Sequence, residues 1–167
     1  MLAPGKIKDI EAKAEDVLST LIKEDGDISF PVPLAKIAEN YGLTIKVVDF
    51  PKGSISGAYD RSIGTIYVSS SEPAQRQAFT IAHELGHALL HKDKGAEILY
   101  RTDLHDLDSP LPAEEQEANW FAASLLMPKD HVRRYFNVLD NPDLLATVFG
   151  VSPSAMRFRL KNLGLLK

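Results

Sequence analysis

The stretch AQRQAFTIAHELGHALLHK, residues 74–92, decides the fold. Its apolar residues recur at helical spacing, and Pro73 stands just before it, where a first helical turn accepts proline, so we expect one long helix. Residues 83–87 fit the pattern H-E-x-x-H. Residues four apart share one helix face, so the imidazoles of His83 and His87 can reach one ion. Glu84, between them, is placed to accept a proton from water rather than to bind the ion.

Two other residues of this helix need an explanation. Gly86 costs a helix about 1 kcal/mol relative to alanine. It therefore indicates either close packing against a neighbouring element or room for a substrate, and we prefer packing. His91 lies eight residues beyond His83, about 12 Å along a straight helix, which is too far to share one tetrahedral ion with both earlier histidines. We interpret His91 as a structural residue.

The composition restricts the kind of site and the cellular setting. A chain of 167 residues with 44% hydrophobic residues can bury the core of one compact domain. It has no cysteine, so a metal site must use His, Asp or Glu. The net charge of −4 argues against non-specific binding to nucleic acid. The N-terminus lacks a signal-peptide pattern, and no apolar run approaches the roughly 18 to 20 residues of a membrane span, so we expect a cytoplasmic protein without membrane association.

The rest of the chain predicts an α+β fold, with helices packed around a small, largely antiparallel three-stranded sheet. The helical patterns cover residues 6–24, 31–42 and 113–127. The short, β-branched patterns of strands cover residues 43–50, 54–60 and 64–70, whereas residues 96–111 have an irregular pattern. We expect a metal-binding domain over residues 1–136 and a smaller subdomain over residues 137–167.

The C-terminal stretch DLLATVFGVSPSAMRFRLKNLGLL, residues 143–166, has small, turn and core residues where a helix-turn-helix places them. Arg157, Arg159 and Lys161 would lie on its second helix and are candidate contacts for DNA or a protein partner. DNA binding is not favoured, because the chain is acidic overall and shows no basic arm.

Three stretches together resemble the ImmA/IrrE family of metallopeptidases. They are FTIAHELGHALLH (79–91), EQEANWFAASLLMP (115–128) and the upstream SISGAYDRSIGTIYVSSSEPAQRQ (54–77). The resemblance implies a zincin-like helix carrying a gluzincin-like zinc site, and an endopeptidase that cleaves a helix-turn-helix repressor encoded nearby. Mn²⁺ is an alternative to Zn²⁺ as the metal in the cell.

The third metal ligand is expected to come from a second helix. The extended metzincin pattern would need Gly at position 90 and His at position 93, where this chain has Leu and Asp. The segment EEQEAN instead offers Glu114, Glu115 and Glu117. In gluzincins the ligand glutamate is followed, four residues on, by an Asp or Asn that hydrogen-bonds a ligand histidine. This resemblance favours Glu115, with Asn119 as that partner, over Glu117.

Two further groups of residues are candidates for catalysis and substrate binding. Tyr100, Arg101 and His105 lie between the two metal helices and could stabilise an oxyanion. The strand residues Ser56, Gly57, Ala58 and Tyr59 could offer a sheet edge to an extended peptide.

The sequence leaves two hypotheses for the function. One is a zinc endopeptidase that inactivates a transcriptional repressor. The alternative is a non-catalytic regulator that binds DNA or protein and contains a structural zinc site. Glu84 favours the endopeptidase, because a structural site has no use for an uncoordinated carboxylate at that position.

Overall fold

The computed structural model describes residues 2–22, 27–51, 55–91 and 111–167, together with the backbone of residues 98–101. The described helices and strands follow one another as α1 (Pro4–Ser19), α2 (Leu34–Asn40), β1 (Thr44–Val48), β2 (Gly57–Asp60), β3 (Thr65–Ser69), α3 (Ala74–Leu90), β4 (Ile98–Arg101), α4 (Ala113–Leu126), α5 (Lys129–Leu139), α6 (Pro142–Phe149) and α7 (Pro153–Asn162). The α+β class predicted from the sequence is confirmed.

The sheet has four described strands in the order β1-β3-β2-β4. β1 pairs with β3 in parallel, with Thr44 opposite Thr65, whereas β2 is antiparallel to both β3 and β4. Two of the three pairings are therefore antiparallel, as expected, and the sheet has one strand, β4, beyond the three that the sequence predicted. The fourth strand, β4, lies within residues 96–111, where the sequence pattern was irregular. A four-residue strand is too short for a clear alternation of apolar and polar residues.

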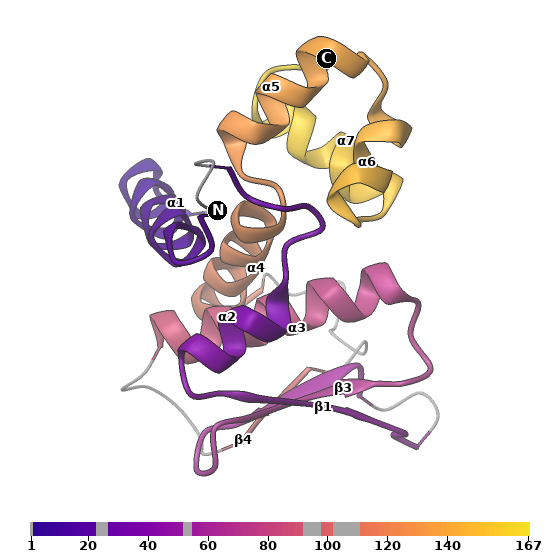
Figure 1. Ribbon diagram of the computed structural model, residues 1–167. Helices are drawn as coiled ribbons and strands as arrows, with labels where there is room; N and C mark the ends of the chain where they lie inside the picture. Colours follow the sequence, from indigo (N-terminus) through magenta and orange to yellow (C-terminus); the bar gives the residue numbers. More distant parts are fainter. Residues whose placement is uncertain (1, 23–26, 52–54, 92–97, 102–110) are drawn as a thin grey trace.

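Helix α3 lies in the middle of the molecule, across one face of the sheet (Figure 1). It packs against β2 and β3 on that side and against α4 on another, and α1 packs in turn against α4. Every residue from Ala82 to Leu89 is therefore buried. A helix surrounded in this way is normally apolar all round. The buried polar residues of this stretch, His83, Glu84 and His87, consequently need partners from neighbouring elements.

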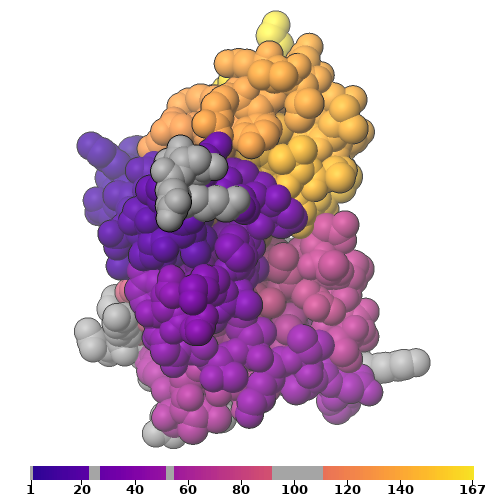
Figure 2. All heavy atoms as spheres, viewed as in Figure 1, coloured from indigo at the N-terminus to yellow at the C-terminus, as the bar shows by residue number. Residues whose placement is uncertain are grey.

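The C-terminal helices α5, α6 and α7 form the end of the molecule opposite the sheet, as the orange and yellow surfaces of Figure 2 show. α6 and α7 pack on each other. The turn between them contains Gly150 at φ 66°, followed by Ser152, whose Oγ accepts a hydrogen bond from the amide of Ala155. Glycine is favoured at this position for two reasons. Residues with a side chain rarely adopt a positive φ, and an added Cβ would lie 2.7 Å from Cγ of Pro31. The helix-turn-helix shape predicted from the sequence is thus formed by these two helices.

One cluster of buried apolar residues extends from α1 to α7. It includes Val17 of α1, Leu85 of α3, Leu125 of α4 and Leu160 of α7. The division at residues 136 and 137 remains a prediction. None of the described helices is long and apolar enough to cross a lipid bilayer.

Candidate metal centre

His83 and His87 present their Nε2 atoms to the same point. Both lie on α3, four residues apart, and both are almost fully buried, at 1% and 2% exposure. Their Nε2 atoms are 3.0 Å apart. The helix period of 3.6 residues brings the two rings to one face, as the H-E-x-x-H spacing predicted.

Glu115, in the first turn of α4, completes this group. Its Oε2 lies 3.2 Å from Nε2 of His83, and its Oε1 lies 3.1 Å from Nε2 of His87. Hydrogen bonds with His83, then with His87, hold the pKa of the Glu115 carboxyl far below its ordinary value, although burial opposes them. The carboxyl is therefore ionised at neutral pH, as a metal ligand must be.

The spacing of the three groups fits a metal ion. His83, His87 and Glu115 form a cluster whose donor atoms all lie within 4.8 Å of one another. Bonds of about 2.0 Å to a tetrahedral zinc ion would place any two ligand atoms about 3.3 Å apart. The measured separations of 3.0–3.2 Å are close to this value. Two imidazoles and one carboxylate are also the donor types that zinc binds at catalytic sites.

Close packing between α3 and α4 brings Glu115 to the histidines. A Cβ added at Gly86 would lie 3.1 Å from Cα of Ala118 and 3.2 Å from Cδ1 of Phe121, both on α4. Backbone and a buried ring cannot easily yield, so a side chain at this position would push the helices apart. Of the two explanations offered for Gly86, packing is the one that these contacts favour.

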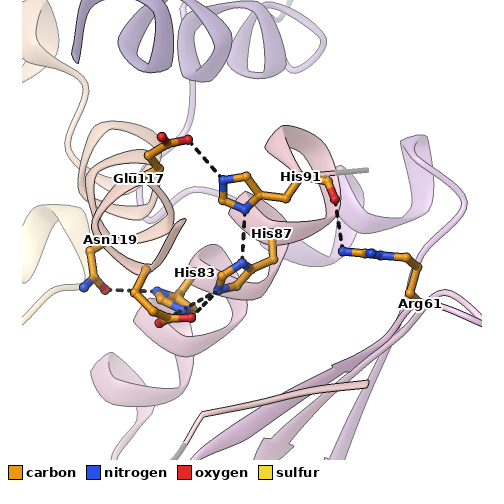
Figure 3. Close-up of polar contacts among 7 residues, drawn as sticks. Arg61, His83, His87, His91, Glu117 and Asn119 are labelled. Carbon is orange, nitrogen blue, oxygen red and sulfur yellow. Dashed lines mark hydrogen bonds and ion pairs between the residues drawn. The ribbon is translucent and has the colours of Figure 1, made fainter. Parts of the chain in front are cut away.

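Asn119 contacts His83 at Nδ1, the ring nitrogen that does not face Glu115. Its Oδ1 lies 3.0 Å from Nδ1 of His83 (Figure 3). Asn119 follows Glu115 by one helical turn, so both side chains reach α3 from the same face of α4. An acceptor at Nδ1 favours the tautomer of His83 that leaves the lone pair on Nε2.

His91 contacts the second histidine in a similar way. Its Nδ1 lies 3.2 Å from Nδ1 of His87, and its Nε2 lies 3.1 Å from Oε2 of Glu117. His91 is 4% exposed, and its backbone carbonyl accepts a hydrogen bond from Arg61 at 3.0 Å (Figure 3). The sequence interpretation excluded His91 as a ligand but missed these contacts. Its spacing of four residues from His87 was a signal that the two rings share one face.

Glu84 lies on α3 between the two histidines and faces the sheet. It is 1% exposed, and a Cβ added at Gly57 of β2 would lie 3.7 Å from Glu84 Oε1. The same added atom would overlap Cγ2 of Thr80, so glycine permits β2 to approach α3 closely. The role of Glu84 as general base remains a prediction.

The prediction that Ser56, Gly57, Ala58 and Tyr59 form a sheet edge was wrong. The β2 strand, which begins at Gly57, pairs with β3 on one side and with β4 on the other. The edge position expected for it is occupied by β4, which comes from the stretch interpreted as irregular. Tyr100 and Arg101 belong to β4, but their side chains, like all of His105, lie outside the described residues. These three candidates for oxyanion stabilisation therefore remain predictions.

Arg159 was also wrongly predicted to contact DNA or a partner. It is 2% exposed, its Nε donates to the carbonyl of Met127 at 3.1 Å, and its guanidinium lies 3.5 Å from Glu11 of α1. Burial lowers its pKa, and the Glu11 charge opposes this effect. The local sequence of α7 does not indicate the two groups that favour burial of Arg159, the carbonyl of Met127 and the carboxylate of Glu11. Arg157 and Lys161 are exposed, and Arg157 pairs with Asp143 at 2.7 Å.

Comparisons with known proteins identify relatives of this chain. Residues 38–161 match the model of peptidase family M78, the IrrE N-terminal-like domain. The radiation response metalloprotease IrrE of Deinococcus deserti is 39% identical over 92 residues, which cover 53% of this chain and 31% of that protein. Immunity region protein 2 of Bacillus phage phi105 is 34% identical over 109 residues, which cover 65% of each chain. The chain thus matches less than two thirds of the length of either relative.

A solved structure has the same fold. A transcriptional regulator from Mycobacterium tuberculosis superposes with a TM-score of 0.62, covering 92% of this chain and 47% of the other, at 19% identity. At this identity the likeness shows the fold alone. The family match covers most of the chain and contains His83, His87 and Glu115. This chain therefore belongs to the ImmA/IrrE family of metallopeptidases, which carry the IrrE N-terminal-like domain.

Proposed function

We propose that this chain is a zinc-dependent endopeptidase, and that its substrate is a helix-turn-helix transcriptional repressor. The observation that carries the proposal is the donor set itself. Among the described residues, three protein groups converge on one point, and the further histidine of α3, His91, points its Nε2 at Glu117 instead. Structural zinc sites are normally closed by four protein ligands, whereas catalytic sites have three and keep a position for water or substrate.

His83, His87 and Glu115 would hold the metal. When bound, zinc supplies Lewis acidity, which lowers the pKa of water and polarises a peptide carbonyl. Mn²⁺ could serve in the same position, because imidazole and carboxylate groups bind both metals.

Glu84 would perform the proton transfers. It lies between the two ligand histidines but is not part of the converging group. A buried carboxylate in this position can accept a proton from the attacking water and deliver it to the leaving amine of the cleaved peptide bond. Tyr100, Arg101 and His105 are the proposed sources of a donor for the oxyanion.

Three considerations support the choice of substrate. The chain belongs to a peptidase family, and one relative is named a radiation response metalloprotease. Another relative is named an immunity region protein of a phage. The repressor itself is inferred from the resemblance to the ImmA/IrrE family, whose studied members cleave such proteins. A repressor substrate would place the protein in the cytoplasm.

The alternative is a non-catalytic regulator that binds DNA or protein and contains a structural zinc site, and its DNA-binding form, acting through α7, has less support. Of the three basic residues considered for this role, Arg159 is buried and Arg157 is paired with Asp143. Lys161 alone of the three is exposed without an ion pair to another described residue. One such cation gives little attraction to a phosphate backbone.

Incubation of the zinc-loaded protein with the helix-turn-helix repressor encoded beside it tests the proposal. We expect a discrete pair of fragments that disappears when a chelator is added. The matched control is zinc-loaded Glu84→Gln, which keeps the shape of the side chain and should lose about 10²- to 10⁴-fold in cleavage rate. Cleavage by this variant at the wild-type rate would contradict the mechanism, and an intact repressor with the wild-type protein would contradict the substrate.

A further inference from the structure

The second ligand histidine is connected to the N-terminal helix by a chain of polar contacts. His87 Nδ1 lies 3.2 Å from His91 Nδ1, and His91 Nε2 lies 3.1 Å from Glu117 Oε2. Lys6 of α1 then places its Nζ 3.1 Å from the same Oε2 atom. The chain of contacts therefore crosses three helices, α3, α4 and α1, and Figure 3 shows its part from His87 to Glu117.

The charges of Lys6 and Glu117 fix the direction of the hydrogen bonds in this series of contacts. Oε2 of Glu117 lies 3.1 Å from Nζ of Lys6, which can only donate, and 3.1 Å from Nε2 of His91, so the Glu117 carboxylate is the acceptor in both contacts. His91 therefore donates from Nε2 to Glu117. A neutral His91 then has its lone pair on Nδ1. In its contact with His87, Nδ1 of His91 is therefore the acceptor and Nδ1–H of His87 is the donor.

This direction determines which nitrogen of His87 can bind a metal. A neutral imidazole carries one proton. With that proton on Nδ1, the lone pair of His87 is on Nε2, the atom 3.0 Å from Nε2 of His83. Coordination requires this tautomer, and an acceptor on the far side of the ring both selects it and fixes the ring plane.

We propose that His91, Glu117 and Lys6 are positioning residues of the metal centre, and that α1 is a functional part of it. His91 orients His87, Glu117 sets the tautomer of His91, and Lys6 holds the Glu117 carboxylate in place. The proposal depends on metal binding by His83, His87 and Glu115, but not on peptide cleavage or on a particular substrate.

The contribution of α1 would not be apparent from the family match. That match begins at residue 38, whereas α1 ends at Ser19. α1 is nevertheless connected to the centre through the contact of Lys6 with Glu117, and it is anchored by buried apolar residues, among them Ile10 and Val17. Point variants are preferable to a truncation, because loss of α1 would also expose part of the core.

Zinc affinity, measured by competition with a chromophoric chelator, tests the proposal. His91→Phe fills the space but removes the acceptor, and we expect a loss of about 10- to 100-fold. His91→Gln keeps an amide oxygen that can accept from His87 and should recover part of the loss. Glu117→Gln should weaken binding less than His91→Phe. Lys6→Met should weaken it by up to about fivefold, because the Lys6 side chain is about half exposed, which limits the strength of its ion pair with Glu117.

Two variants serve as matched controls. Glu114→Gln removes a neighbouring carboxylate of α4 that makes no ion pair with the described residues, and Lys8→Met removes a second exposed lysine of α1. Neither should change zinc affinity. The visible spectrum of the cobalt-loaded protein gives a second measurement, since it changes with coordination geometry. We expect an altered spectrum for His91→Phe and Glu117→Gln at saturating cobalt, and wild-type spectra for both controls.

The outcomes separate this proposal from the proposed function. Wild-type zinc affinity and cobalt spectra in His91→Phe and Glu117→Gln would overturn the positioning role, whether or not the protein cleaves a repressor. If His91→Phe does not fold, Glu117→Gln and Lys6→Met still test the role, because both side chains reach solvent. Weakened metal binding in these variants would support it even if no repressor is cleaved.

Discussion

Oδ1 of Asn119 lies 3.0 Å from Nδ1 of His83, on the side of the ring opposite the point where His83, His87 and Glu115 converge. We predict that Asn119→Ala lowers zinc affinity about 10- to 100-fold, because His83 loses the acceptor that selects its tautomer. Asn119→Asp keeps an acceptor oxygen and should bind zinc nearly as tightly as the wild type. Chelator competition measures both affinities, and equal affinities for the Ala and Asp variants would contradict this role.

The three glutamates of α4 differ in their distance from the centre, and their Gln variants should differ accordingly. Glu115 contacts both His83 and His87, Glu117 contacts His91, and Glu114 makes no ion pair with the described residues. We expect Glu115→Gln to lose by far the most zinc affinity, Glu117→Gln to lose less and Glu114→Gln to lose none. Isothermal titration with zinc checks this order. A larger loss at Glu117 than at Glu115 would show that Glu115 is not the ligand.

Gly86→Ala tests whether helix contact positions Glu115. Alanine should favour the helix by about 1 kcal/mol, but crowding a packed core costs about 1–3 kcal/mol. Because the added Cβ would press on Cα of Ala118, we expect a net loss in the free energy of unfolding and weaker zinc binding. Gly5→Ala in α1 is the control, since its Cβ would meet no atom within 4 Å. Urea denaturation should show no loss for the control, and an unaltered Gly86→Ala protein would contradict the packing argument.

Arg159→Met should destabilise the protein by about 2 kcal/mol, because the buried carbonyl of Met127 loses this donor. Glu11 loses one of its two cations among the described residues and keeps Lys129, whose Nζ lies 3.7 Å from its Oε2. The matched control is Arg157→Met on the same helix, whose exposed pair with Asp143 should contribute at most about 1 kcal/mol. Urea denaturation compares the two variants. Equal, small losses would show that Arg159 does not hold α7 against α1 and the end of α4.

The sequence alone was sufficient for features that depend on neighbours a few residues apart. The face shared by His83 and His87 follows from the helix period, and so does the position of Asn119 one turn after Glu115. The turn at Gly150 was recognised for the same reason, because a left-handed conformation favours glycine and its local sequence pattern is distinctive. Glu115 itself was selected over Glu117 by resemblance to gluzincins, not by periodicity.

Only the tertiary structure decided the features that depend on elements far apart in the chain. The pairing of β2 with β4 removed the expected edge at Gly57, since a strand's neighbours are set by sheet topology and not by its own residues. Likewise, Arg159 is drawn inward by a carbonyl at residue 127 and a carboxylate at residue 11. A basic residue on a helix is buried only where such partners meet it, because the cost of removing its charge from water must be offset by contacts that local sequence does not reveal.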